Sequence, residues 1–264
     1  MGGRGIKLFN LSGFEVRLHS SWFILGVLVV FSLAGGFFPI RFPGYSQADY
    51  WLMALGGAVG LLFSIVVHEY AHSVVARRYG IPMRGITLFI FGGVAEMGDE
   101  PPTAKSEFLM AIAGPITSFL VAAASFVIAA VISSVGAPGF GAVFSYLAWI
   151  NATLGLFNLV PAFPLDGGRV LRAAIWARNG DIVRATRIAS NIGSGFGFLL
   201  MLLGAWSVFR GSVVGGIWWI LIGLFVRNAS DMSYRQVLYR RAAQERDIQE
   251  LLDGGQQEPV AGKF

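Results

Sequence analysis

Long apolar runs dominate this sequence and restrict the folds that are open to it. Hydrophobic residues make up 55% of the 264 positions and charged residues only 13%, whereas a typical soluble domain carries about 25% charged residues. Almost all of the longest runs exceed the roughly 18 residues that mark a membrane-spanning helix. We therefore predict an all-α, multi-pass protein of the lipid bilayer, with six spanning helices at residues 20–40, 51–79, 107–135, 143–160, 188–209 and 212–226.

Two short segments outside these helices are patterned as β-strands. Residues 5–19 alternate apolar and polar side chains on either side of Ser12 and Gly13, which predicts a hairpin at the membrane surface. Residues 86–97 are rich in β-branched and aromatic residues and are interrupted by Gly92 and Gly93, which predicts a strand pair. This pair is apolar enough to lie partly in the bilayer, where protein or a water-filled cavity must satisfy its backbone.

The distribution of Lys and Arg predicts the orientation of the helices. In the six-helix layout, every Lys and Arg except Arg41 and Arg210 falls on the same side of the membrane. Because positive residues are retained in the cytoplasm, we expect a protein of the cytoplasmic membrane with both termini in the cytoplasm. The same distribution explains the net charge of +5, so nucleic acid is not an expected partner.

The polar residues gather at the C-terminal end of the chain. We expect residues 1–226 to form one six-helix domain. Residues 227–264 are expected to form a cytoplasmic tail that is helical over about residues 234–252 and then disordered, because its last residues are rich in Gly, Gln and Pro.

Three ionisable residues, His68, Glu69 and His72, directly follow the uncharged residues 51–67. On a helix, His68 and His72 lie one turn apart on the same face, a spacing that lets two imidazole nitrogens bind one tetrahedral Zn²⁺. Glu69, next to His68 in the sequence, can then reach the metal-bound water and act as its base. Ionisable groups inside a membrane-spanning helix are costly and usually functional. The alternative is a pair of structural histidines held by partners in the core.

A zinc site of this kind needs a third ligand. The chain has no Cys, so that ligand must be a His or a carboxylate. His19 is the only other His and lies at the edge of the first helix, whereas Asp166 lies within an apolar stretch that two prolines and two glycines interrupt. The predicted topology places Asp166 at the depth of His68 and His72, which makes it the expected third ligand. The alternatives are a turn that ends the helix, or a residue that orients a ligating histidine.

The two motifs together resemble those of the site-2 protease family of intramembrane zinc metalloproteases. The resemblance rests on H-E-x-x-H in the second helix and N-x-x-P-x-x-P-x-D-G at the end of the fourth, and it extends over about residues 5–226. It implies a zinc ion bound by His68, His72 and Asp166, with Glu69 activating the water. It further implies an oxyanion-stabilising or substrate-holding role for Asn158, and substrate binding by strand addition at Phe91, Gly92 and Gly93.

The same resemblance implies an activity. The expected substrates are membrane proteins with a single span, cleaved in or near that span to release a regulatory fragment. The connection between the second and third helices is too short for a PDZ domain, and residues 227–264 are too few for a pair of CBS domains, so we expect the branch without PDZ, with the CBS pair absent or truncated. Two other functions remain open, a zinc transporter that uses the same ligands and an inactive scaffold that binds helices. Association into a homo-oligomer is also left open.

Overall fold

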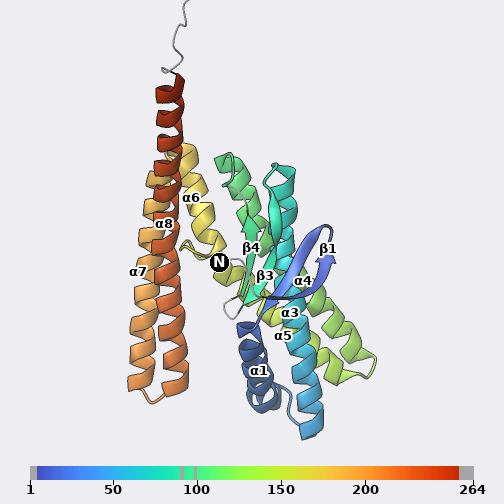
Figure 1. The fold of residues 1–264 in the computed structure, drawn as a ribbon. Coiled ribbons are helices and arrows are strands. Elements are labelled where there is room, and N and C mark those ends of the chain that lie inside the picture. The colour runs from blue at the N-terminus through green and yellow to red at the C-terminus, as the bar shows by residue number, and fades with distance from the viewer. Residues whose placement is uncertain (1–4, 90–91, 98–99, 256–264) are drawn as a thin grey trace, which may run out of the picture. The chain divides into compact units, whose positions relative to one another are not determined.

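The computed structural model describes residues 5–89, 92–97 and 100–255 (Figure 1). The chain forms two compact units. The first contains Met1–Val160 and Leu165–Val170, and the second contains Pro161–Pro164 and Leu171–Phe264.

A four-stranded sheet belongs to the first unit. Its strands are β1 (Gly5–Leu11), β2 (Phe14–His19), β3 (Met83–Phe89) and β4 (Gly92–Met97), in the order β1-β2-β3-β4. The pairs β1–β2 and β3–β4 are antiparallel, and β2 runs parallel to β3. The hairpin and the strand pair expected from the sequence are therefore both present, and they join into one sheet.

The β1–β2 turn and the buried face of the sheet explain why these residues form strands. Ser12 and Gly13 have φ values of 50° and 89°, and two successive positive φ values suit a two-residue hairpin loop. On the inner face, Val16 is fully buried, as are Ile86 and Leu88 of the neighbouring strand. These side chains pack against Ile65 and Val66 of the long helix α3, so the sheet lies beside the helical turn that precedes His68.

Six helical segments form most of the rest of the first unit. The first span consists of α1 (Ser21–Ser32), a π-helical turn η1 (Leu33–Phe37) and α2 (Phe38–Arg41). It is followed by α3 (Gln47–Arg78), α4 (Ala104–Ser134) and α5 (Pro138–Asn158). Capping boxes begin α3 at Ser46 and α4 at Thr103, where each side-chain oxygen satisfies a backbone N–H that has no partner within the helix.

The chain leaves helical geometry after Asn158 and resumes it at Asp166. Residues 159–165 are turns and bends, and α6 (Asp166–Asn179) begins at the aspartate. The interruption was expected, because Pro161 and Pro164 lack the N–H that a continuing helix needs. The helix α6 itself was not expected. It places the carboxylate of Asp166 in the first turn of a helix, within the first unit.

The second unit is built on two long helices, α7 (Ile182–Phe209) and α8 (Val213–Gly255). They approach one another so closely that a Cβ atom added at Gly197 would lie 2.6 Å from the carbonyl oxygen of Gly223. The same holds for Gly204 and the carbonyl oxygen of Gly216. Small residues of this kind let helix backbones meet directly.

The sixth expected helix is longer than the sequence predicted. It does not end at Val226, because α8 continues through polar residues to Gly255. No Gly or Pro occurs between Gly223 and Gly254, so nothing in the chain interrupts the helix where its apolar part ends. The division of the chain into domains at residue 226 stays a prediction.

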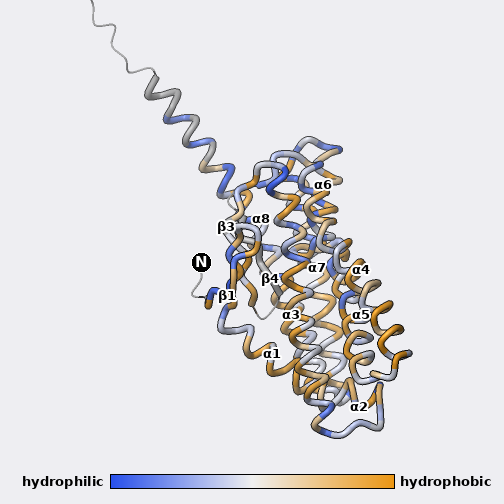
Figure 2. Tube along the Cα trace, turned by 90° about the vertical axis from the view of Figure 1, so that its right-hand side faces the viewer, coloured by the Kyte–Doolittle hydropathy of each residue, from blue (hydrophilic) through white to orange (hydrophobic). Residues whose placement is uncertain are grey.

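The prediction of six spans is confirmed within the described residues. Six helices there are long and apolar enough to cross a membrane, namely Ser21–Arg41, Gln47–Arg78, Ala104–Ser134, Pro138–Asn158, Ile182–Phe209 and Val213–Ala243. Figure 2 shows hydrophobic residues along α3, α4 and α5, and many of their large apolar side chains are exposed, as expected where lipid covers the surface. The orientation of the spans stays a prediction.

Candidate metal centre

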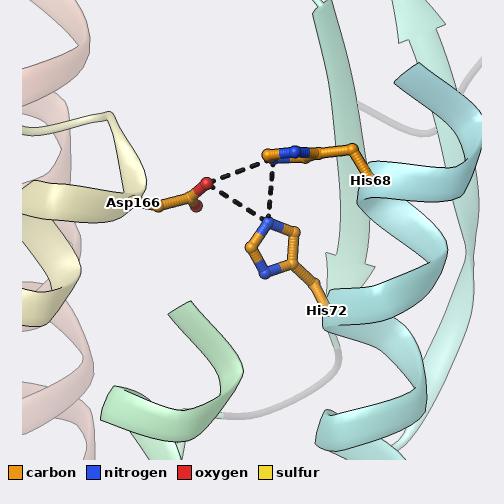
Figure 3. A group of neighbouring side chains, drawn as sticks. All are labelled: His68, His72 and Asp166. Carbon is orange, nitrogen blue, oxygen red and sulfur yellow. Dashed lines mark hydrogen bonds and ion pairs between the residues drawn. The ribbon is translucent and has the colours of Figure 1, made fainter. Parts of the chain in front are cut away.

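The helix α3 presents His68 and His72 on one face, four residues apart (Figure 3). Their Nε2 atoms are 3.2 Å apart. Both side chains are buried, with 4% and 6% of their surface exposed. The two imidazoles therefore direct their Nε2 atoms at one small volume inside the first unit.

Asp166 completes the group from the first turn of α6. Its Oδ2 atom lies 3.2 Å from Nε2 of His68 and 3.3 Å from Nε2 of His72. Ligand atoms about 2.0–2.1 Å from a tetrahedral zinc are separated from one another by about 3.3–3.4 Å. The three atoms therefore have the spacing of three corners of such a tetrahedron, and the residues fit a zinc ion with one coordination position left open.

The two histidines lower the pKa of Asp166. Burial disfavours its charged form, but the adjacent His72 and His68 outweigh burial and hold the pKa of Asp166 below its usual range. The carboxylate, rather than the neutral acid, is therefore the form that faces the two histidines.

The helix α4 orients both imidazoles through their other nitrogens. Nδ1 of His72 donates to the backbone carbonyl oxygen of Met110 at 2.7 Å, and because a carbonyl only accepts, the neutral ring carries its proton there and leaves Nε2 free. Nδ1 of His68 lies 2.8 Å from the hydroxyl oxygen of Ser118. Hydrogen bonds of this kind fix the ring orientation of metal-ligating histidines. Sequence reasoning missed Met110 and Ser118.

Between these two contacts, Gly114 faces the centre itself. Met110, Gly114 and Ser118 are four residues apart and share one face of α4. A Cβ atom at Gly114 would lie 2.2 Å from Nε2 of His72 and 2.6 Å from Nε2 of His68. The absence of a side chain at this position leaves the space in which a metal ion would sit.

Glu69 follows the first histidine and is partly exposed. Its carboxylate is close enough to His72, His68 and Asp166 to interact with them electrostatically. Glu69 thus lies near the three candidate ligands and is not one of them, and its role as a base stays a prediction.

The remaining predicted residues lie on other elements. Asn158 is the last residue of α5, and its Nδ2 donates to the carbonyl oxygen of Leu154 at 3.0 Å. None of the three candidate ligands is among the partners described for Asn158. Gly92 and Gly93 begin β4, opposite Phe89 and Leu88 of β3. Phe91 lies outside the described residues.

Comparisons with known proteins agree with this geometry. The model of peptidase family M50 matches residues 56–138 and 132–203, which include the H-E-x-x-H motif and Asp166. The solved structure of a site-2 protease from Methanocaldococcus jannaschii is similar to this chain with a TM-score of 0.59 and 33% identity, over 87% of this chain and 95% of that chain.

Curated relatives extend over most of the sequence. Rip3 of Mycobacterium tuberculosis, whose name describes a zinc metalloprotease, is 42% identical over 226 residues, which are 85% of this chain and 57% of Rip3. A zinc metalloprotease of Methanocaldococcus jannaschii is 32% identical over 88% of this chain and 61% of its own length. The chain thus spans about three fifths of the length of these curated relatives.

These matches confirm the predicted family. Several matched relatives are named as zinc metalloproteases, which is the enzyme class and the metal predicted from the sequence. Within its described residues the chain has six candidate spans and a possible His/His/Asp metal-binding group, and the family model matches more than half of its sequence. It therefore belongs to peptidase family M50, the family of the site-2 proteases.

Proposed function

We propose that this chain is a zinc-dependent endopeptidase that cleaves membrane-anchored proteins in or near their transmembrane segments, as in regulated intramembrane proteolysis. One observation carries the proposal. His68, His72 and Asp166 direct three ligand atoms at one point with tetrahedral spacing, and Glu69 stands beside them without being a ligand. A catalytic zinc site has this composition, because three protein ligands leave one position for water or substrate.

The residues divide the chemistry among them. Zinc, when bound, lowers the pKa of water to about 7 and polarises a carbonyl. Glu69 takes the proton of the attacking water and delivers it to the leaving amine. Asn158 donates a hydrogen bond to the oxyanion or to the substrate backbone, and loss of one such donor typically costs about 10²–10³ in rate. Nδ2 of Asn158 carries two N–H groups, so it can keep its bond to Leu154 and offer the second N–H to the substrate.

The sheet offers the substrate a place to bind. β4 is the last strand in the order β1-β2-β3-β4 and pairs with β3, so its outer edge supports the proposal that Gly92, Gly93 and the adjoining Phe91 receive an extended substrate segment by strand addition. A transmembrane substrate must unwind locally to offer such a segment, because a helix satisfies its own backbone groups.

The distribution of charge supports a location in the cytoplasmic membrane with both termini in the cytoplasm, because only Arg41 and Arg210 fall on the opposite side of the six spans. In this orientation the ligands on α3 lie in the cytoplasmic half of the bilayer. The proposed partners are then the surrounding lipid and a substrate with a single span. Measurement of the molecular mass in detergent would show whether the chain also forms a homo-oligomer.

Cleavage of a single-span reporter with a helix-weakening stretch, in detergent, tests the proposal. We expect cleavage by the wild-type protein, no cleavage by Glu69→Gln or after zinc chelation, and bound zinc retained in Glu69→Gln. Glu15→Gln is the matched control, because Glu15 lies on the hairpin and pairs with Lys7 and Arg17. Bound zinc without cleavage of several reporters would instead favour a transporter, which zinc flux into liposomes would reveal. Folded protein without zinc would refute the metal centre.

A further inference from the structure

A buried polar contact joins α3 to α5 one helical turn before the metal centre. Nδ2 of Asn151 donates to the hydroxyl oxygen of Ser64 at 2.8 Å and to the carbonyl oxygen of Leu147 at 2.8 Å. Ser64 in turn donates to the carbonyl oxygen of Gly60 at 2.8 Å. Only 1% of Asn151 and 3% of Ser64 is exposed. The contact is therefore a hydrogen bond between two helices, shielded from water and lipid.

Ser64 and Asn151 each lie on the same helix face as the predicted site residues of their own helix. Ser64, His68 and His72 are spaced by four residues and share one face of α3. Asn151 precedes Asn158 by seven residues, which is two turns of α5 and again one face. The hydrogen bond thus connects the face that carries the metal ligands to the face that carries Asn158.

The neighbouring contacts show that α3 and α5 run parallel in a fixed register. A Cβ atom at Gly56 would lie 3.6 Å from Val143, and one at Gly60 would lie 2.6 Å from Leu147. The pair Ser64 and Asn151 follows after another step of four residues on each helix. The next equal step brings His68 level with Gly155, and Asn158 is three residues further on. A shift of the register by one turn would therefore move Asn158 by about 5.4 Å along α3.

The contact stabilises the fold less than an apolar contact at the same place would. Oδ1 of Asn151 is buried and has no hydrogen-bond partner among the described residues, and burying an unsatisfied amide oxygen costs free energy that an apolar side chain of similar size would not. Apolar contacts between helices tolerate sliding, whereas a single buried polar pair specifies one register. The free-energy cost of burying Oδ1 of Asn151 is consistent with a role of this pair in setting the register of α3 against α5.

We propose that Asn151, through Ser64, is a positioning residue that locks the register between α3 and α5. The lock holds Asn158 at the level of the metal ligands and of Glu69. The inference rests on the proposed peptidase function for its kinetic consequence, but the lock itself is a property of the two helices and can be measured without catalysis.

The first test is kinetic. Asn151→Leu removes the hydrogen bond and keeps the branched shape of the side chain, and Ser64→Ala removes it by a smaller change. We expect both variants to keep the zinc content and the KM of the wild type, while kcat falls about 10–100-fold, since a misplacement of about 1 Å can cost about 10²-fold. The exchange Ser64→Asn with Asn151→Ser restores the same two groups and should recover part of kcat. Ser145→Ala is the control, because Ser145 bonds within α5 to Gly141 and should act like the wild type.

The second test measures the register directly. The chain has no Cys, so cysteines placed at Phe63 on α3 and Leu156 on α5, which are 64% and 68% exposed, can carry two spin labels. We expect the dipolar distance distribution to broaden in Asn151→Leu and Ser64→Ala and to narrow again in the exchanged pair.

The outcomes separate this inference from the proposed function. A wild-type protein that cleaves nothing would refute the peptidase, while broadened distances in the variants would still support the lock. Unchanged distances would overturn the lock whether or not the protein is a peptidase. Loss of zinc or of folded protein in parallel with kcat, in both Asn151→Leu and Ser64→Ala, would also overturn it, because the contact would then serve general stability alone.

Discussion

Nδ1 of His72 donates a hydrogen bond of 2.7 Å to the backbone carbonyl oxygen of Met110. The partner is main chain, so substitution of the Met110 side chain leaves the acceptor in place. Ser118 serves His68 from the same helix through a hydroxyl group instead. The two histidines of one motif are thus oriented by two different kinds of partner, and only the one at Ser118 can be removed by mutation.

Ser118→Ala should therefore weaken zinc binding without removing a ligand. His68 would lose the partner that fixes its ring, and loss of such a partner typically lowers metal affinity about 10–100-fold. Competition with a graded series of zinc chelators measures the change. Ser125→Ala, at another buried serine of α4, should bind zinc like the wild type. Equal affinities in the two variants would contradict the role assigned to Ser118.

Gly114→Ala should abolish zinc binding while the protein stays folded. The added methyl group would overlap the Nε2 atoms of His68 and His72, whereas alanine is otherwise favoured over glycine in a helix by about 1 kcal/mol. Zinc content and thermal unfolding in detergent report the two effects separately. Gly195→Ala is the matched control, because a Cβ atom there would meet nothing within 4 Å. A variant at Gly114 that retains zinc would show that the metal sits elsewhere.

Gly197→Val should destabilise the second unit. Its side chain would meet the carbonyl oxygen of Gly223 and the backbone N–H of Arg227, which cannot yield as a flexible side chain does. Overpacking typically costs about 1–3 kcal/mol, and contact with backbone places this variant at the upper end. The melting temperature in detergent should fall relative to that of Gly195→Val, which is the control on the same helix. Equal melting temperatures would mean that α7 and α8 are not in backbone contact.

The ion pairs of the β1–β2 hairpin should be insensitive to pH near neutrality. Hydrogen bonds from Arg17 and Lys7 lower the pKa of Glu15, so any stability they contribute is fully present above the ordinary pKa of a glutamate and is lost only as pH falls through the lowered value. The difference in melting temperature between the wild type and Glu15→Gln should therefore be small, and the same at about pH 5 and about pH 8. A difference that changes between these pH values would contradict this assignment.

The sequence predicted the candidate ligands because their chemistry is rare in this chain. His68 and His72 are two of three histidines, and Asp166 is an acid in an apolar stretch, so few combinations could hold a metal. The six spans were equally predictable, because hydropathy over about 18 residues is a strong signal.

The residues of α4 that contact the two histidines were not predictable, because their residue types are common in apolar helices. Serine is common in apolar helices, and Ser106, Ser118 and Ser125 are all buried in α4. Which of them meets His68 depends on the rotation of α4 about its own axis, and that rotation is set by packing against α3 rather than by any local pattern. The length of α8 escaped prediction because polar residues signal the end of a span but not the end of a helix.

The parallel pairing of β2 with β3 has a consequence for biogenesis. Val16 pairs with Ile86, so the first span and the ligand-bearing helix α3 both lie within a loop of chain whose two ends the sheet joins. The sheet can close only after these helices have been synthesised, and the metal centre stays incomplete until α4 and finally Asp166 have followed. A nascent chain that carries only the H-E-x-x-H motif therefore has two of the three candidate ligands, so the metal centre is completed late in synthesis.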